Sequence, residues 1–247
     1  MSGRRRLEER AGFAPRPRMG RDYELRAVLT SCRCGVYDRE MEDRRDLAAF
    51  VLAGGKSTRM GQDKAFLNYA GRSLLARALE IAHSVAPEVR IVGSREKFAR
   101  DADVVEDIFS GRGPLAGIHA ALRASQADLN LMIAVDMPLL SQEFLQYLTN
   151  VARHSDAIAI VPRAGGHWQP LCAIYRRNFA DVAERELAAG RNKIDSLFGK
   201  TETLPIEEPE LQRAGFFSSL FRNLNTPEEL EELEKQISDL KSPPVRV

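Results

Sequence analysis

The sequence has few of the residues that mark secreted, metal-cluster or membrane proteins. Three cysteines among 247 residues cannot all pair, so no disulfide framework is expected and the reducing cytosol fits the chain. Cys32 and Cys34 lie too close together, without other ligands nearby, for a zinc site. No apolar run approaches the roughly 18 residues of a membrane span. We therefore expect a cytoplasmic protein without a membrane partner.

The chain also lacks a strong excess of charge of either sign, although its charge is uneven. Residues 1–46 carry 12 Lys and Arg against 9 Asp and Glu. Of the 36 basic and 35 acidic residues in the whole chain, the remainder therefore carries 24 and 26. A slightly acidic body does not favour nucleic acid, and no nucleic-acid partner is expected.

Residues 1–46 show no sustained apolar pattern. They mix arginine runs, Pro15, Pro17 and scattered acids, which predicts a separate, weakly structured arm. The apolar centre of a secretory signal is missing, and a transit peptide would avoid acids such as Glu8. Met41 stands just before the first strand pattern. An alternative is therefore that the gene model begins upstream of the true initiator.

Beyond this arm, strand-like and helix-like apolar patterns alternate. The strand patterns cover residues 48–53, 89–92, 104–105, 129–135, 157–161, 171–175 and 201–206. The helix patterns cover residues 74–86, 118–124, 141–153, 179–189 and 226 to about 240. This alternation predicts one three-layer α/β domain over residues 47–240, with a mostly parallel central sheet and a tail at 241–247.

Capping and turn residues mark several boundaries. Ser73 and Asn178 are expected to cap the helices that follow them. Thr226 and Glu229 have the spacing of a capping box. Residues 163–170, which hold the only tryptophan, are expected to form a polar loop.

Residues 48–64, AAFVLAGGKSTRMGQDK, join a buried strand to a basic loop. Gly54 and Gly55 let the backbone turn sharply and bring its N–H groups close to a ligand. Three cations follow in this loop: Lys56, Arg59 and Lys64. Together these groups suit a polyanion such as a triphosphate. The spacing is not that of a Walker loop, because Ala65 follows Lys64. A strand followed by an exposed basic loop is the alternative.

The strand pattern at residues 129–135 ends at Asp136, Met137 and Pro138. An acid at the carboxyl end of a central strand stands where open α/β sheets bind ligands. Mg²⁺ takes only one or two protein carboxylates and completes its coordination with phosphates and water. Asp136 is therefore the candidate Mg²⁺ ligand, and capping of the next helix is its alternative role.

Residues 52–64 resemble the signature loop of the molybdenum cofactor guanylyltransferases, L-A-G-G-x-S-x-R-M-G-x-D-K, a family of Rossmann-like nucleotidyltransferases. Sugar-nucleotide pyrophosphorylases usually have proline where this chain has Asp63. Residues 136–138 match the family's D-x-P metal site, and residues 223–227 are close to its N-x-N-T-P motif. The resemblance covers residues 47–240 and departs at Gly93, where some members have asparagine.

The resemblance implies a role for each candidate residue of a nucleotide site. Arg59 and Lys64 would hold the β- and γ-phosphates, and Asp136 would be the third catalytic residue. The expected nucleotide contacts are Leu52, Ala53, Gly54, Gly55, Lys64, Asp107 and Asp136. On its residues alone, Asp107 would be an ordinary loop acid. The family's second nucleotide-contacting segment, which resembles residues 106–107 and 113–117, is what makes it a site residue.

The acceptor would bind the second half of the chain, by the same resemblance. Arg191 and Lys193 are candidates for its phosphate, with a solvated basic turn as the alternative. Asn223 and Asn225 present amide donors and acceptors that suit a heterocycle. Turn formation is the alternative for Asn225.

The family implies a Mg²⁺-dependent transfer of GMP from GTP to the phosphate of Mo-molybdopterin, with release of pyrophosphate. Molybdenum-insertion proteins and client molybdoenzymes are further expected partners. One alternative is a cytidylyltransferase, although such relatives typically read L-A-A-G where this chain reads LAGG. The other is a catalytically silent nucleotide or pterin carrier. A carrier has no need for a metal carboxylate such as Asp136 at an α-phosphate.

Overall fold

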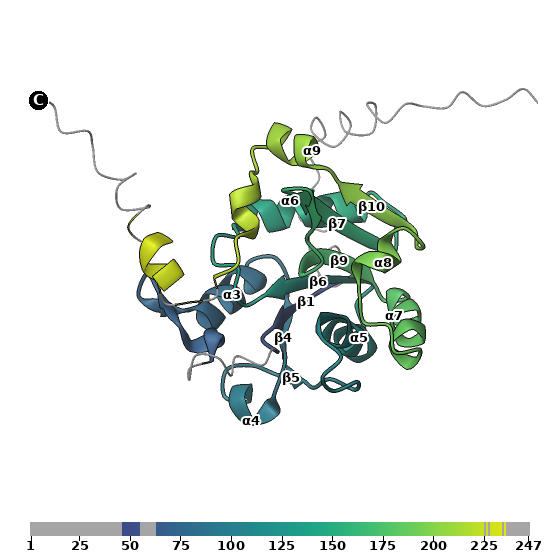
Figure 1. The fold of residues 1–247 in the computed structure, drawn as a ribbon, viewed down its shortest axis with the longest axis horizontal. Coiled ribbons are helices and arrows are strands. Elements are labelled where there is room, and N and C mark those ends of the chain that lie inside the picture. Colours follow the sequence, from purple (N-terminus) through teal and green to yellow (C-terminus); the bar gives the residue numbers. More distant parts are fainter. Residues whose placement is uncertain (1–45, 55–62, 225, 227, 234, 236–247) are drawn as a thin grey trace, which may run out of the picture. The chain divides into compact units, whose positions relative to one another are not determined.

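A computed structural model gives the structure of the protein and describes residues 46–54, 63–224, 226, 228–233 and 235. A mixed eight-stranded sheet is central to this part of the chain (Figure 1). Its strands are β1 (Leu47–Leu52), β4 (Glu88–Val92), β5 (Val104–Val105), β6 (Leu129–Ala134), β7 (Ala159–Ala164), β8 (His167–Trp168), β9 (Cys172–Arg176) and β10 (Thr203–Ile206). Within the described ranges, no helix has the length and apolar character that a membrane crossing needs.

The strands lie in the order β10-β7-β9-β6-β1-β4-β5, with β8 paired to β7. β9 is antiparallel to both of its neighbours, and the other pairs along this path are parallel. β1 lies between β4 and β6, and Leu52 at its end is in register with Val92 and Ala134. The prediction of a mostly parallel sheet is therefore confirmed. The carboxyl ends of the two strands beside β1 meet the end of β1 at one edge.

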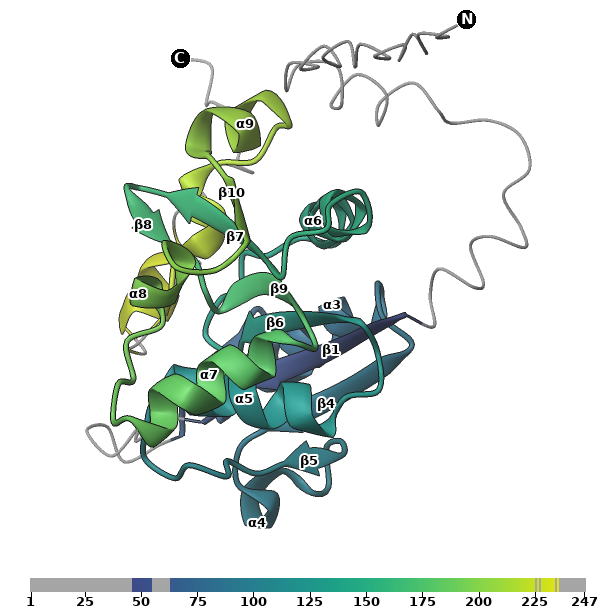
Figure 2. The same cartoon turned by 90° about the vertical axis from the view of Figure 1, so that its right-hand side faces the viewer.

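Helices cover both faces of the sheet and complete three layers (Figure 2). One face carries α3 (Leu74–His83) and α6 (Gln142–Arg153), and the other carries α5 (Pro114–Ala124) and α7 (Phe179–Ala188). Because side chains alternate along a strand, β1 contributes to both cores. Ala49 and Val51 pack under α3 and α6, whereas Ala48 and Phe50 pack under α5 and α7.

Short elements complete the domain around this sheet. They are η1 (Lys64–Phe66), β2 (Asn68–Tyr69), β3 (Arg72–Ser73), α4 (Arg95–Phe98), α8 (Asp195–Phe198), α9 (Glu208–Arg213) and η2 (Ser218–Phe221). β2 and β3 form an antiparallel hairpin. Residues 228–233 are helical.

The predicted caps are formed at two of three sites. Ser73 accepts a hydrogen bond from the backbone of Ala76. Thr226 and Glu229 exchange the two bonds of a capping box, at 3.1 and 3.3 Å. Asn178 stands at the N-cap of α7, but its side chain makes no capping bond there. Its backbone is already helical, with φ −67° and ψ −14°, rather than in the extended conformation of a usual N-cap.

Two expected segments take a different form, and the β2–β3 hairpin and helices α4 and α9 were not expected. α5 begins at Pro114, before the predicted 118, because proline suits the first helical position and the preceding Gly113 takes a φ of 73°. Within the expected loop at 163–170, residues 163–164 and 167–168 instead pair as the end of the β7–β8 hairpin, with residues 165–166 as its turn. Gly165 and Gly166 take φ values of 59° and 76° there, which is the conformation that tight hairpin turns require.

Candidate nucleotide site

The first loop leaves the end of β1 between two neighbouring strands. The N–H of Ala53 donates to the Val92 carbonyl at 2.9 Å, and the Leu52 carbonyl accepts from Val135 at 3.2 Å. Among the described residues, a Cβ placed on Gly54 would meet only the Val92 oxygen, at 3.9 Å. At Gly54, the part of the chain that the structure describes therefore leaves the backbone open to a close ligand. The predicted contacts Gly55 and Arg59 lie outside the described residues.

Lys64 and Asp136 face each other at the end of the central strands. Lys64 Nζ lies 3.8 Å from Asp136 Oδ2, and their side chains are 28% and 20% exposed. Burial raises the pKa of Asp136, although the Lys64 ammonium opposes this shift. The structure thus brings together two residues that the sequence predicts for catalysis.

Capping of the next helix does not explain Asp136. The N-cap of α6 is Ser141, whose hydroxyl accepts from Phe144 N at 3.2 Å. Among the described residues, no cluster of three or more His, Cys, Asp and Glu side chains is suited to a metal ion. A single partly buried carboxylate nevertheless fits Mg²⁺, which takes most of its ligands from phosphates and water.

Asp107 lies near Leu52, the last residue of β1, on the face of the sheet that α5 covers. A Cβ placed on Gly117 of α5 would lie 3.0 Å from Leu52 Cδ2 and 3.5 Å from Asp107 Oδ1. These three residues therefore meet where β1 ends and α5 begins. Burial raises the pKa of Asp107, so its carboxylate is partly withdrawn from water.

The candidate acceptor residues fall in two places. Asn223 is exposed, and the N–H of its neighbour Leu224 donates to the Asp136 carbonyl at 2.9 Å. Arg191 instead holds Glu186 through two hydrogen bonds, at 2.7 and 2.8 Å, and Lys193 is exposed in the turn after α7. Asn225 lies outside the described residues.

Arg112 is a cation at this edge that the sequence did not single out. Its Nη1 lies 3.8 Å from the position of a Cβ on Gly190, so it reaches the turn that carries Arg191 and Lys193. Residues so far apart in sequence are brought together by the packing of α5 against α7. Only the neighbouring Gly-Pro-Leu-Ala-Gly segment could have indicated this position.

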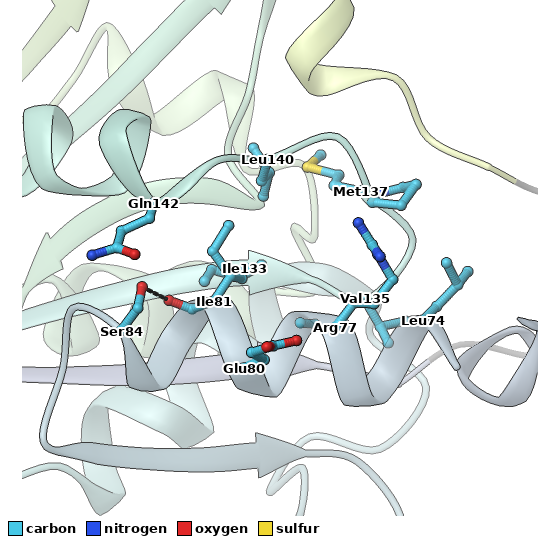
Figure 3. A pocket seen from close by; sticks show the side chains of 12 residues that line it. Leu74, Arg77, Glu80, Ile81, Ser84, Ile133, Val135, Met137, Leu140 and Gln142 are labelled. Carbon is cyan, nitrogen blue, oxygen red and sulfur yellow. Dashed lines mark hydrogen bonds between the residues drawn. The ribbon is translucent and has the colours of Figure 1, made fainter. Parts of the chain in front are cut away.

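A cleft of about 240 Å³ lies behind the Asp136 turn, between α3 and the start of α6. Met137 lines it, Arg77 reaches into it from α3, and Gln142 lies at the α6 end (Figure 3). The predicted nucleotide residues are not part of its lining. It is therefore distinct from the edge of the sheet where Lys64, Asp107 and Asp136 gather.

Known proteins resemble this chain in sequence and in structure. The family model of the MobA-like NTP transferase domain matches residues 49–204. A probable molybdenum cofactor guanylyltransferase of Clostridium perfringens is 33% identical over 193 residues, which cover 76% of this chain and 96% of that protein. The molybdenum cofactor guanylyltransferase of Syntrophotalea carbinolica is 33% identical over 194 residues, covering 76% and 91%.

A solved structure extends the similarity to the fold. It is the molybdopterin-guanine dinucleotide biosynthesis protein A of Archaeoglobus fulgidus, which superposes with a TM-score of 0.67 at 29% identity. The match covers 78% of this chain and 99% of that one. The family that the first loop indicated is thereby confirmed. The chain belongs to the MobA-like NTP transferase family, together with the molybdenum cofactor guanylyltransferases.

Proposed function

We propose that this chain transfers GMP from GTP to the phosphate of molybdenum-bound molybdopterin and releases pyrophosphate. The observation that carries the proposal is the Lys64–Asp136 pair, 3.8 Å apart at the end of β6 and beside the loop that follows β1. A cation for the leaving phosphates and a carboxylate for a metal ion are what nucleotidyl transfer asks of a protein. The names of the relatives indicate guanylyl transfer to the molybdenum cofactor.

In this proposal, each residue acts on a different part of GTP. The backbone of Leu52, Ala53 and Gly54 borders the nucleotide, and Asp107 contacts it from the α5 side. Lys64 holds the β- and γ-phosphates together with Arg59. The preference for guanine comes from buried polar groups that would lose their partners with another base.

The acceptor phosphate attacks the α-phosphorus directly. A bond forms between an acceptor oxygen and this phosphorus, while the bond from the α-phosphorus to the oxygen bridging to the β-phosphate breaks. The electron pair of the broken bond leaves with pyrophosphate, whose charge Lys64 and Arg59 stabilise. Mg²⁺, held by Asp136, would supply further neutralisation of the triphosphate.

The pterin part of the acceptor is assigned to the second half of the chain. Asn223 lies beside the Asp136 turn, because the Leu224 backbone bonds to Asp136. Its exposed amide is available to the donors and acceptors of a heterocycle. Arg191 and Lys193 are the proposed contacts for an acceptor phosphate. Asn225 is a second proposed contact for the heterocycle.

The proposed reaction also implies partners that supply the acceptor and receive the product. A molybdenum-insertion protein would supply the acceptor, and client molybdoenzymes would receive the product. Cys172 is a free thiol buried in the core, which suits a reducing compartment. We therefore place the reaction in the cytoplasm. We also propose that residues 47–240 form the folded domain and that the residues before them form an N-terminal arm.

Label transfer tests this function against its two alternatives. GTP labelled at the α-phosphate is incubated with Mg²⁺, molybdenum-bound molybdopterin and the protein. The label should move to the pterin product, whereas label placed at the γ-phosphate should appear only in pyrophosphate. A carrier would bind GTP or pterin without any transfer. A cytidylyltransferase would transfer label from CTP in preference to GTP.

A further inference from the structure

The four-residue helix α4 contacts the segment that carries Lys64. Lys97 Nζ lies 2.7 Å from Asp63 Oδ2, and the Asp63 side chain is 18% exposed. The other carboxylate oxygen of Asp63 accepts from Ala65 N at 3.2 Å and caps η1. Phe98 is buried, and its ring lies 5.8 Å from that of Phe66. Asp63 thus connects Lys97 to the turn in which Lys64 is the first residue.

The same helix contacts the segment that carries Asp107. The N–H of Arg95 donates to Glu106 Oε1 at 3.0 Å, and the Arg95 guanidinium donates to the Val104 carbonyl at 2.9 Å. Glu106 directly precedes Asp107 in the chain. α4 is therefore tied at both of its sides, to η1 and to the end of β5.

Gly93 explains how α4 comes so close to the sheet. A Cβ on Gly93 would lie 3.1 Å from Phe98 Cε2 and 3.2 Å from Cδ2, which is closer than ordinary contact. The Phe98 ring therefore occupies the space that a side chain at 93 would need. The chain has no side chain at this position, and Phe98 of α4 packs there instead.

We propose that α4 is a positioning element of the nucleotide site, in which Lys97 acts through Asp63 to fix Lys64 relative to Asp107. This inference rests on the proposed function. Lys97 neutralises Asp63, so the capped turn presents Lys64 with its charge directed to the triphosphate and to Asp136. Arg95 fixes the opposite side of the same nucleotide through Glu106. Lys97 itself does not touch the nucleotide.

A double-mutant cycle on Lys97 and Asp63 tests the proposal. Lys97→Met keeps the aliphatic stem and removes the charge, whereas Asp63→Asn keeps an oxygen that can cap η1 and removes the ion pair. Each single variant should raise the Kd for GTP with Mg²⁺ by roughly three- to tenfold. The effect is modest because the Lys97–Asp63 ion pair acts on the nucleotide only through the position of Lys64. The double variant should be no weaker than either single one, and Lys97→Arg should restore tight binding.

Arg100→Met is the matched control, because it removes one exposed positive charge just beyond the same helix. It should leave the Kd within about twofold of the unmutated protein, as surface changes usually do. In turnover, Lys97→Met should raise the KM for GTP while the KM for the pterin acceptor stays the same. A role confined to stability would lower the melting temperature without this separation.

Three results would overturn the inference. The first is a Kd for GTP in the double variant that is raised by the product of the two single effects, which would mean that Lys97 acts on the nucleotide independently of Asp63. The second is an unchanged Kd in Lys97→Met. The third is an equal loss of GTP affinity in Arg100→Met. The cycle on Kd needs no turnover. An unmutated protein that binds GTP but releases no pyrophosphate would therefore refute the proposed function and leave this inference to be decided by the cycle.

Discussion

Leu224 donates its backbone N–H to the carbonyl oxygen of Asp136 at 2.9 Å. The two residues come from distant parts of the chain, and Leu224 is fully buried. This bond fixes Leu224, and with it the neighbouring Asn223, against the turn that carries the candidate metal ligand. An acceptor held by Asn223 would therefore lie next to a nucleotide held by Lys64 and Asp136.

We predict that Asn223→Ala raises the KM for the pterin acceptor about fivefold to tenfold. This change corresponds to the loss of one hydrogen bond that contributes about 1 kcal/mol to acceptor binding. The Kd for GTP should not change, because the exposed amide is assigned to the acceptor. Steady-state kinetics with each substrate varied in turn, and calorimetry for GTP, measure the two effects. An equal loss of affinity for GTP would assign Asn223 to the nucleotide instead.

Asp136→Asn should lower turnover by about a hundredfold, or about 3 kcal/mol in the activation free energy. The asparagine side chain has similar size but no charge for Mg²⁺ or for Lys64. Pyrophosphate release at saturating GTP measures this effect. Turnover near that of the unmutated protein would remove Asp136 from the metal site.

The same substitution should not weaken the fold. Burial raises the pKa of Asp136 above its ordinary value, so the folded protein binds this proton more tightly than the unfolded chain does. The resulting penalty is complete above the raised pKa and disappears as the pH falls below the ordinary value. Without metal, Asp136→Asn should raise the melting temperature by about 1–3 °C at roughly pH 7 and not at roughly pH 3. A clear drop at neutral pH would mean that the ion pair with Lys64 outweighs burial.

Two glycines near the site should respond differently to alanine. Gly93→Ala should cost about 1–2 kcal/mol in the free energy of unfolding, because its Cβ would lie 3.1 Å from the packed Phe98 ring. Gly54→Ala should change stability by less than about 0.5 kcal/mol, because its nearest contact among the described residues would be 3.9 Å away. Urea unfolding of both variants compares them. Equal stabilities would show that α4 can move away from Gly93 at little cost.

A shortened chain that starts at Met41 should fold and turn over like the full chain. Residues 1–40 show no sustained apolar pattern that would join a core, and β1 begins only at Leu47. The melting temperature should stay within about 2 °C, and the KM for GTP within about twofold. A larger loss of either would make the arm part of the functional domain.

The long strands and the four helices that cover the sheet could be predicted because their sequence patterns are local. Apolar patterns located β1, β5 and β6, and the parallel ends of β1 and β6 explain why Asp136 lies beside the residues that follow β1. The 3-10 turn η1 that begins at Lys64 has no such pattern. The sequence could not show the 2.9 Å bond between Leu224 and Asp136, since it depends on the packing of a distant segment. The role of Lys97 was equally hidden, because a lysine in a short exposed helix has no distinguishing pattern.

We predict that Gly54 and Asp107 contribute to a preference for guanine. Among the described residues, only the Val92 oxygen comes near a Cβ on Gly54, and Asp107 and Leu52 both lie against Gly117 of α5. A purine is larger than a pyrimidine, so the space beside Gly54 suits guanine better than cytosine. Gly54→Ala combined with changes in residues 113–117 should therefore reduce the preference for GTP.

The most direct test of the account is a competition between nucleotides for the unmutated protein. Pyrophosphate release is measured with molybdenum-bound molybdopterin, Mg²⁺ and either GTP, CTP or ATP. We predict that kcat/KM is highest for GTP by about a hundredfold or more, because unpaired buried polar groups penalise the wrong base. Equal or faster turnover with CTP would contradict guanylyl transfer, although the assignment to the nucleotidyltransferases would stand.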